Sequence, residues 1–117
     1  MAFTELELKA IDGVVGDYCR RKSQPRFADQ LRYACDIKGH AVSIFEERVP
    51  WDGRGGAWTR MGVARFRYVR SEKAWKLYWM RADLRWHLYE PDPGEMPTDL
   101  EALLRLVEED RLGAFFG

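Results

Sequence analysis

Residues 61–90 read MGVARFRYVRSEKAWKLYWMRADLRWHLYE and contain three runs in which apolar side chains alternate with polar or charged ones. The alternating runs begin at Ala64, Trp75 and Leu84. A period of two is typical of β-strands that bury one face, because successive side chains point to opposite sides of a sheet. The stretch therefore predicts three antiparallel strands joined by short turns.

Turn positions set the register of this predicted meander. Tight turns at residues 72–73 and 81–82 would pair Tyr68 with Leu77, and Leu77 with Trp86. This register keeps the apolar residues of all three runs on one face, whereas a slip of one residue would turn a strand's apolar face to water. The three tryptophans Trp75, Trp79 and Trp86 would then pack in the core. The opposite face would carry two rows, which are Arg67–Tyr78–Arg85 and Val69–Lys76–His87.

The rest of the chain supplies two helices and a hairpin. Thr4 to Glu7 fits a capping box, and a helix follows to about Lys22. Its predicted core-facing stripe is Leu8, Ile11, Val15 and Tyr18. Residues 31–37 and 40–48 predict two strands joined at Lys38–Gly39, with Cys35 opposite Val42 and Tyr33 opposite Ile44.

A second capping box at Thr98–Glu101 predicts a C-terminal helix with Leu100, Leu103, Leu104 and Val107 facing the core. The apolar end, Phe115-Phe116-Gly117, is expected to dock on the protein. Helix, two strands, three strands and helix predict one α+β domain spanning residues 1–117. Its sheet would be an antiparallel meander of about five strands, with the N-terminal and C-terminal helices packed on one face.

Charge is balanced overall and unevenly distributed. The chain has 117 residues, with 19 Lys and Arg against 19 Asp and Glu. Zero net charge argues against binding nucleic acid or a membrane by charge alone. Residues 54–85, however, contain nine basic residues and two acids, whereas residues 90–110 contain eight acids and one base.

Several features predict a cytoplasmic protein. The N-terminus lacks a basic leader followed by an apolar run, and no window is apolar enough to span a membrane. Cys19 and Cys35 lie in apolar patterns, which favours reduced, buried thiols, with a disulfide as the alternative. The sequence predicts no membrane association.

Four segments resemble a family of small bacterial proteins catalogued as domain of unknown function 3024. They are Phe45-Glu46-Glu47-Arg48 followed by Pro50 and Trp51, residues 64–69 (ARFRYV), residues 75–89 (WKLYWMRADLRWHLY), and Glu109-Asp110 with Phe115-Phe116-Gly117. The resemblance covers nearly the whole chain. It implies no activity and no functional residues, because the family is defined without them.

The predicted basic and aromatic sheet face is the main functional candidate. Sheets that bind single-stranded nucleic acid offer cations to phosphates and aromatic rings to bases. The candidate binding residues are Arg65, Arg67, Lys76, Tyr78, Arg85, His87 and Tyr89, with Arg32 and Phe45 nearby. Three interpretations stay open: an ordinary solvated face, a face for nucleic acid or an anionic ligand, and a contact with an acidic segment of this chain or another. The last would give a homodimer or a protein-interaction module.

A catalytic interpretation rests on Glu46, Glu47, Asp83 and His87. A carboxylate beside a histidine can act in acid–base chemistry, and Asp83 and His87 are expected to approach each other near the last turn. With two histidines and no cysteine pair of the usual spacing, no metal and no cofactor are predicted. No nucleophile motif is present. A small hydrolase or nuclease is therefore the third hypothesis, after a binding module and an interaction module.

The loop at residues 49–57 contains one Pro and three Gly, and Trp51 and Trp58 flank or enter it. It lacks the Gly-Lys-Ser/Thr ending and the following helix of a phosphate-binding loop. Either tryptophan can close over a ligand or pack beneath the loop, and the sequence favours packing.

Overall fold

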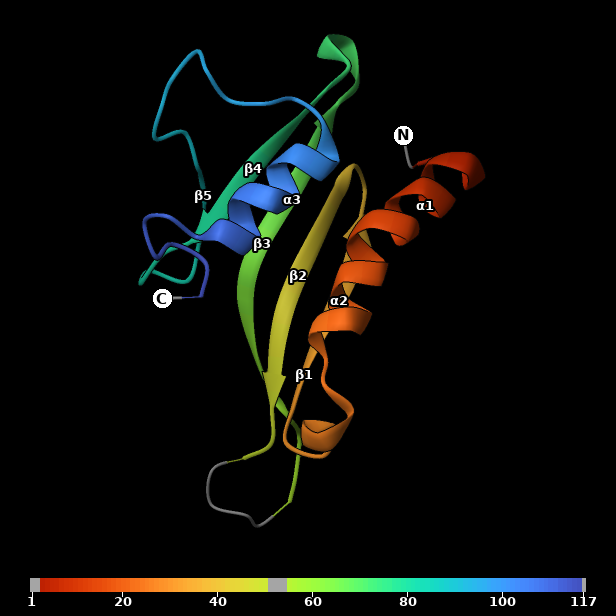
Figure 1. The fold of residues 1–117 in the computed structure, drawn as a ribbon, viewed down its shortest axis with the longest axis vertical. Helices are drawn as coiled ribbons and strands as arrows, with labels where there is room; N and C mark the ends of the chain where they lie inside the picture. The colour runs from red at the N-terminus through yellow and green to blue at the C-terminus, as the bar shows by residue number, and fades with distance from the viewer. Residues whose placement is uncertain (1–2, 51–54, 117) are drawn as a thin grey trace.

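An N-terminal helical stretch and a C-terminal helix cover one face of a five-stranded antiparallel sheet in the computed structural model, which describes residues 3–50 and 55–116 (Figure 1). The strands follow the chain in the order β1 (Leu31–Lys38), β2 (Ala41–Arg48), β3 (Thr59–Val69), β4 (Ala74–Met80) and β5 (Trp86–Leu88). The helical segments are α1 (Glu5–Ile11), η1 (Asp12–Gly16), α2 (Asp17–Lys22), η2 (Pro25–Phe27), η3 (Arg70–Glu72) and α3 (Leu100–Glu109). The predicted α+β meander with both helices on one face is confirmed.

The core lies between the sheet and the helices. Ile44, Phe66 and Leu77 come from the central strands and are almost completely buried. Val15 of η1 and Leu103 of α3 meet them from the helical side. Trp75 and Trp79 are partly buried and pack against this core, so their predicted inward orientation is confirmed.

The N-terminal helix begins at the predicted capping box and then changes from an α-helix to a wider π-helical turn. Thr4 forms the capping box with Glu7, since each backbone N–H is bonded by the other's side chain. Residues 12–16 form a π-helical segment, η1, which adds an extra residue to the turn. Ile11 and Val15 are buried as predicted, but Leu8 is 37% exposed, so its predicted core position was wrong.

Two hairpins differ from the predicted register by an even number of residues. Cys35 lies opposite Ile44 and not Val42. Phe66 lies opposite Leu77, because the β3–β4 connection is a 3-10 turn, η3, ending at Lys73 in the left-handed region. A shift of two residues returns every side chain to the predicted face.

The register of the β4–β5 hairpin differs from the predicted one by an odd number of residues. Each β5 side chain therefore points to the face opposite the predicted one. Its connection spans residues 81–85 and includes Leu84 at a φ of +60°. Trp86 lies opposite Met80, and Trp79 lies opposite His87. Trp86 therefore faces away from the helices, and its predicted place in the core was wrong.

The C-terminal residues dock on the protein as expected. Asp99, and not Thr98, caps α3 by accepting a hydrogen bond from Ala102 N. Asp110 ends the helix, and its carboxylate accepts the backbone N–H groups of Phe115 and Phe116. The Phe115 ring lies 4.9 Å from the ring of Tyr89.

No helix within the described part of the chain is both long and apolar enough to cross a membrane. The glycine loop at residues 49–57 is only partly described, and Trp51 lies outside the described residues.

Candidate functional site

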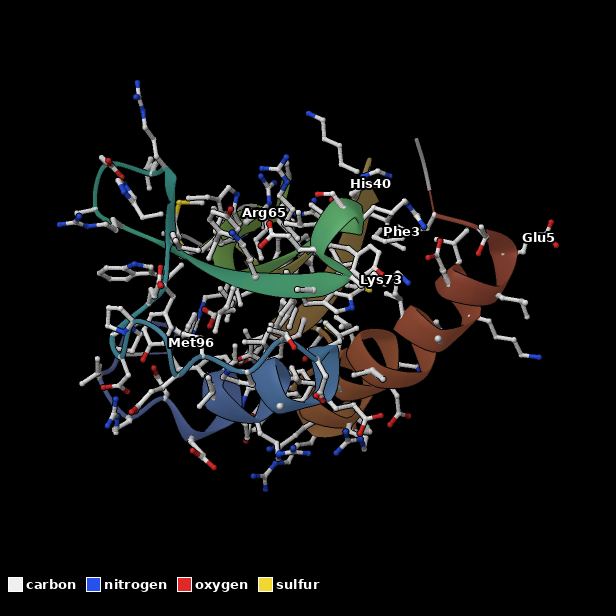
Figure 2. The ribbon with its side chains drawn as sticks, turned by 90° about the horizontal axis from the view of Figure 1, so that it is seen from above. Phe3, Glu5, His40, Arg65, Lys73 and Met96 are labelled. Carbon is white, nitrogen blue, oxygen red and sulfur yellow. The ribbon has the colours of Figure 1, made fainter. Side chains whose placement is uncertain are left out.

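We call the sheet face opposite the helices the outer face. Figure 2 shows α3 below the sheet and α1 at its side, whereas Arg65 and His40 lie above it. The cross-strand partners give its central row, which is Ser43, Arg65, Tyr78 and Leu88, and a neighbouring row of Ala41, Arg67 and Lys76. Its third group is Phe45, Gly62, Met80 and Trp86. No described helix covers this face.

Arg65 is held in a fixed orientation at the centre of the outer face. Its Nε donates a 2.8 Å hydrogen bond to Ser43 Oγ, and Ser43 is buried beneath it. Its guanidinium carbon lies 4.9 Å from the ring centre of Trp86. Burial lowers the pKa of Arg65, yet an arginine remains charged at any physiological pH. The two terminal nitrogens are thus a preoriented fork of N–H donors.

Trp86 can lie flat on the sheet because residue 62 is glycine. A β carbon at Gly62 would come within 2.8 Å of both Met80 Cε and the Trp86 ring. A bulge makes this possible, since Phe45 pairs with Gly62 while Ile44 pairs with Ala64, which leaves one extra residue in β3. The ring of Phe45 meets Trp86 edge-on at 6.3 Å. The two rings form an aromatic surface next to Arg65.

Acidic residues neutralise one end of the outer face. Glu47 accepts hydrogen bonds from Arg32 at 2.8 Å and from Arg60 at 2.9 Å, and Asp36 also pairs with Arg60. These arginines hold the pKa of Glu47 below its usual range, and Arg32 has the larger effect. Arg32 in turn stacks on Trp58 at 4.1 Å. Trp58 therefore contacts the sheet through the Arg32 side chain of β1.

The other end of the face is basic and unpaired. A shallow pocket of about 430 Å³ is lined by Lys38, His40, Ala41, Arg65, Arg67, Tyr78 and Trp86. No carboxylate is among these lining residues, and across residues 3–50 and 55–116 no ion pair involves Lys38, Arg65 or Arg67. Three cations thus surround a space bounded by two aromatic side chains.

The structure brings together four of the seven residues suggested by the sequence. Arg65, Arg67, Lys76 and Tyr78 share the outer face, although Lys76 lies 3.8 Å from Glu72. The predicted rows ending in Arg85 and His87 were wrong, because the β5 side chains point to the opposite face from the predicted one.

The other three suggested residues lie elsewhere. Arg85 belongs to the connection before β5. His87 shares the helical side of the sheet with Trp79, and Tyr89 is buried against Phe115. The sequence analysis did not identify Lys38 and Trp86 as parts of this face. The one signal in the sequence was Gly62, since a glycine within a strand of apolar and basic residues indicates that another group packs closely against it.

The polar residues considered for catalysis are not assembled into one site. His87 Nε2 lies 2.8 Å from Asp83 Oδ2, so the expected approach of these two residues is confirmed. This hydrogen bond lowers the pKa of Asp83. Glu46 pairs instead with Arg48 and accepts a 3.4 Å hydrogen bond from Tyr33 Oη. Among the described residues, no group of three potential metal ligands is present.

Comparison with known proteins places the chain in a family. The family model described as Domain of unknown function (DUF3024) matches residues 3–117. The chain belongs to this family. Neither a curated protein nor a solved structure matches it. Membership in the DUF3024 family therefore agrees with the sequence resemblance and assigns no activity.

Proposed function

We propose that this DUF3024 protein is a binding module whose outer face takes a short segment of single-stranded nucleic acid. The observation that carries the proposal is Arg65, a partly buried arginine fixed by Ser43 and Trp86 with no acidic partner in the described chain. An arginine held in this way offers two parallel N–H donors, which match the oxygens of a phosphate.

Positions of the other groups favour a strand over a simple anion. Lys38 and Arg67 add positive charge on the same pocket, and Tyr78 and Trp86 add aromatic surface beside it. A base stacked on an aromatic side chain gains about 1–3 kcal/mol, and the pairing of duplex bases would prevent this contact. We therefore expect single strands to bind more tightly than duplexes of the same sequence.

Salt dependence gives the first test. Three phosphates neutralised by Lys38, Arg65 and Arg67 would give a slope of log affinity against log salt of roughly −2, at about −0.7 per contact. The measurement is fluorescence anisotropy of a labelled oligonucleotide over a series of salt concentrations. With three contacts and zero net charge, we expect weak binding that is strongest at low salt.

Variants separate the two kinds of contact. Arg65→Lys keeps the charge but removes the planar fork, and should weaken binding by about tenfold. Tyr78→Ala should weaken binding by about 1–3 kcal/mol with an unchanged salt slope. Arg21→Ala is the matched control, because Arg21 is an exposed arginine on α2, on the helical side of the sheet. Equal losses in all three variants, or no binding at low salt, would refute the proposal.

A protein partner is the second candidate for the same face. α3 carries exposed Glu101, Glu108 and Glu109, and it lies on the opposite side of the sheet from Arg65. One copy can thus offer acids to the basic face of another. Light scattering at low salt tests this: a concentration-dependent dimer that Arg65→Ala and Arg67→Ala both disrupt would favour association over nucleic-acid binding.

We place this function in the cytoplasm, where single-stranded RNA and reducing conditions coexist. The support is the pair of free cysteines, Cys19 and Cys35, which is usual for proteins kept in a reducing compartment.

A further inference from the structure

The two cysteines of the chain meet at the junction of α2 and β1. Cys19 of α2 is 4% exposed, whereas Cys35 of β1 is half-buried and packs against the same core. Both side chains point into the layer between the helices and the sheet. No other cysteine exists in the sequence, so neither thiol has a competing partner within the chain.

Ser23 fixes the two segments against each other. Its hydroxyl donates a 2.7 Å hydrogen bond to Cys19 O and accepts a 2.9 Å hydrogen bond from Tyr33 N. Ser23 follows Cys19 by one helical turn, and Tyr33 precedes Cys35 by two residues on the same face of β1. This link holds the Cys19 turn of α2 against the part of β1 that carries Cys35.

The surroundings make the two thiols unequal. The side chains of Cys19 and Cys35 affect each other directly, which lowers the pKa of the Cys35 thiol and raises that of the Cys19 thiol. Burial and the carboxylates of Asp12 and Asp36 oppose this lowering of the Cys35 pKa, and the Arg20 guanidinium supports it to a smaller extent. Since Cys35 is also the more exposed of the two, it is the sulfur that a small oxidant reaches first.

We propose that Cys19 and Cys35 form a reversible oxidation site, at which hydrogen peroxide converts the two thiols into a disulfide that joins α2 to β1. The site lies on the helical side of the sheet and does not depend on the function proposed for the outer face.

The reaction has two balanced steps. The Cys35 thiolate attacks one peroxide oxygen, so that an S–O bond forms, the O–O bond breaks and hydroxide leaves as water after taking a proton. The Cys19 sulfur then attacks the Cys35 sulfur, so that the S–S bond forms, the S–O bond breaks and a second water leaves with the Cys19 proton. Two electrons pass from the sulfurs to the peroxide, and a dithiol reductant returns them.

Oxidation would change stability more than shape. The disulfide would close a loop that contains η2 and the start of β1, and so restrict the unfolded chain. For a loop of this length, we expect the melting temperature to rise by roughly 5–15 °C.

The test uses the wild-type protein treated with hydrogen peroxide at a small molar excess. We expect both thiols to disappear from a thiol assay, the monomer mass to fall by two hydrogen atoms, and a peptide map to show Cys19 linked to Cys35. Dithiothreitol should restore both thiols and the original melting temperature. None of these measurements depends on a variant that has to fold.

Other products would overturn the proposal. These are a mass increase from added oxygen on either cysteine, a disulfide between two copies, or two thiols that survive treatment. Cys19→Ser adds a check with a distinct outcome: without the second thiol, Cys35 should stop at the sulfenic acid, which a dimedone label captures. A Cys19→Ser protein that folds, as shown by circular dichroism, and takes no label would also count against the proposal.

Discussion

The two faces of this sheet bury their side chains by different means. On the helical face, Phe66 and Leu77 are enclosed by aliphatic and aromatic neighbours and leave nothing exposed. On the outer face, Arg65 and Arg60 cover the rings of Trp86 and Phe45 with their guanidinium groups. A stacked guanidinium shields apolar surface while its edge keeps N–H donors available. The difference shows how one sheet can have one face closed by packing and another that keeps N–H donors at its surface.

The largest expected effect is on the helical face. Phe66→Ala removes a side chain with no exposed surface and should lower the free energy of unfolding by about 3–5 kcal/mol. Tyr78→Ala, on the neighbouring strand of the outer face, should cost much less because its face is open. Chemical denaturation of both variants measures this. Equal losses would mean that the outer face is as tightly packed as the inner one.

A smaller effect sharpens the comparison within the outer face. Gly62→Ala places a methyl group against Met80 and Trp86, and should destabilise the protein by about 1–3 kcal/mol.

Gly13→Ala is the control for this variant. Its new β carbon meets nothing within 4 Å, so the change should stabilise the protein by up to about 1 kcal/mol through the lower entropy of the unfolded chain. Thermal melts of the two variants should move in opposite directions. A Gly62→Ala protein with unchanged stability would show that Trp86 is not seated on the strand.

The smallest effect concerns an ion pair that ties α1 to the β3–β4 turn. Arg70 lies 2.9 Å from Glu7, and with a smaller contribution from Thr4 it lowers the pKa of that carboxyl from 4.5 to about 2. Because the folded pKa is the lower one, the stabilisation is complete above about pH 4.5 and is lost as the pH falls toward 2.

Arg70→Ala should return the pKa of Glu7 toward 4.5, and NMR titration of the Glu7 carboxyl measures the change. A Glu7 carboxyl that still titrates near pH 2 in the variant would assign the effect to the backbone of Thr4 instead.

Sequence patterns predicted the fold well, because the alternation of apolar and polar residues determines which side of the sheet a side chain faces. It does not determine which residue lies opposite on the next strand. The β1–β2 and β3–β4 registers were each displaced by two residues, and every side chain still reached its predicted face. The β4–β5 hairpin was displaced by three, which moved Trp86 from the core to the outer face. The cause is Leu84, a leucine in the left-handed region, a conformation that local sequence preference does not indicate.

The candidate site was therefore predictable only in part. Arg65, Arg67, Lys76 and Tyr78 lie on the two strands with the most regular alternation, so their face was correct. Lys38 comes from a distant hairpin, and Trp86 depends on a turn whose geometry the sequence hides. The pairing of Arg32 and Arg60 with Glu47 was also hidden, since it requires the exact neighbours across three strands.

The Ser23 hydroxyl has a second consequence, which concerns the open edge of the sheet. β1 is an eight-residue strand at the edge of the sheet, and an open edge of this length is a template for another strand. Ser23 occupies the backbone N–H of Tyr33, because its hydroxyl oxygen accepts a 2.9 Å hydrogen bond from that group. A second copy cannot extend the sheet across this point without displacing the serine. The Ser23 hydroxyl thus makes the longer sheet edge a poorer template for strand pairing, while the three-residue β5 limits the other edge by its length.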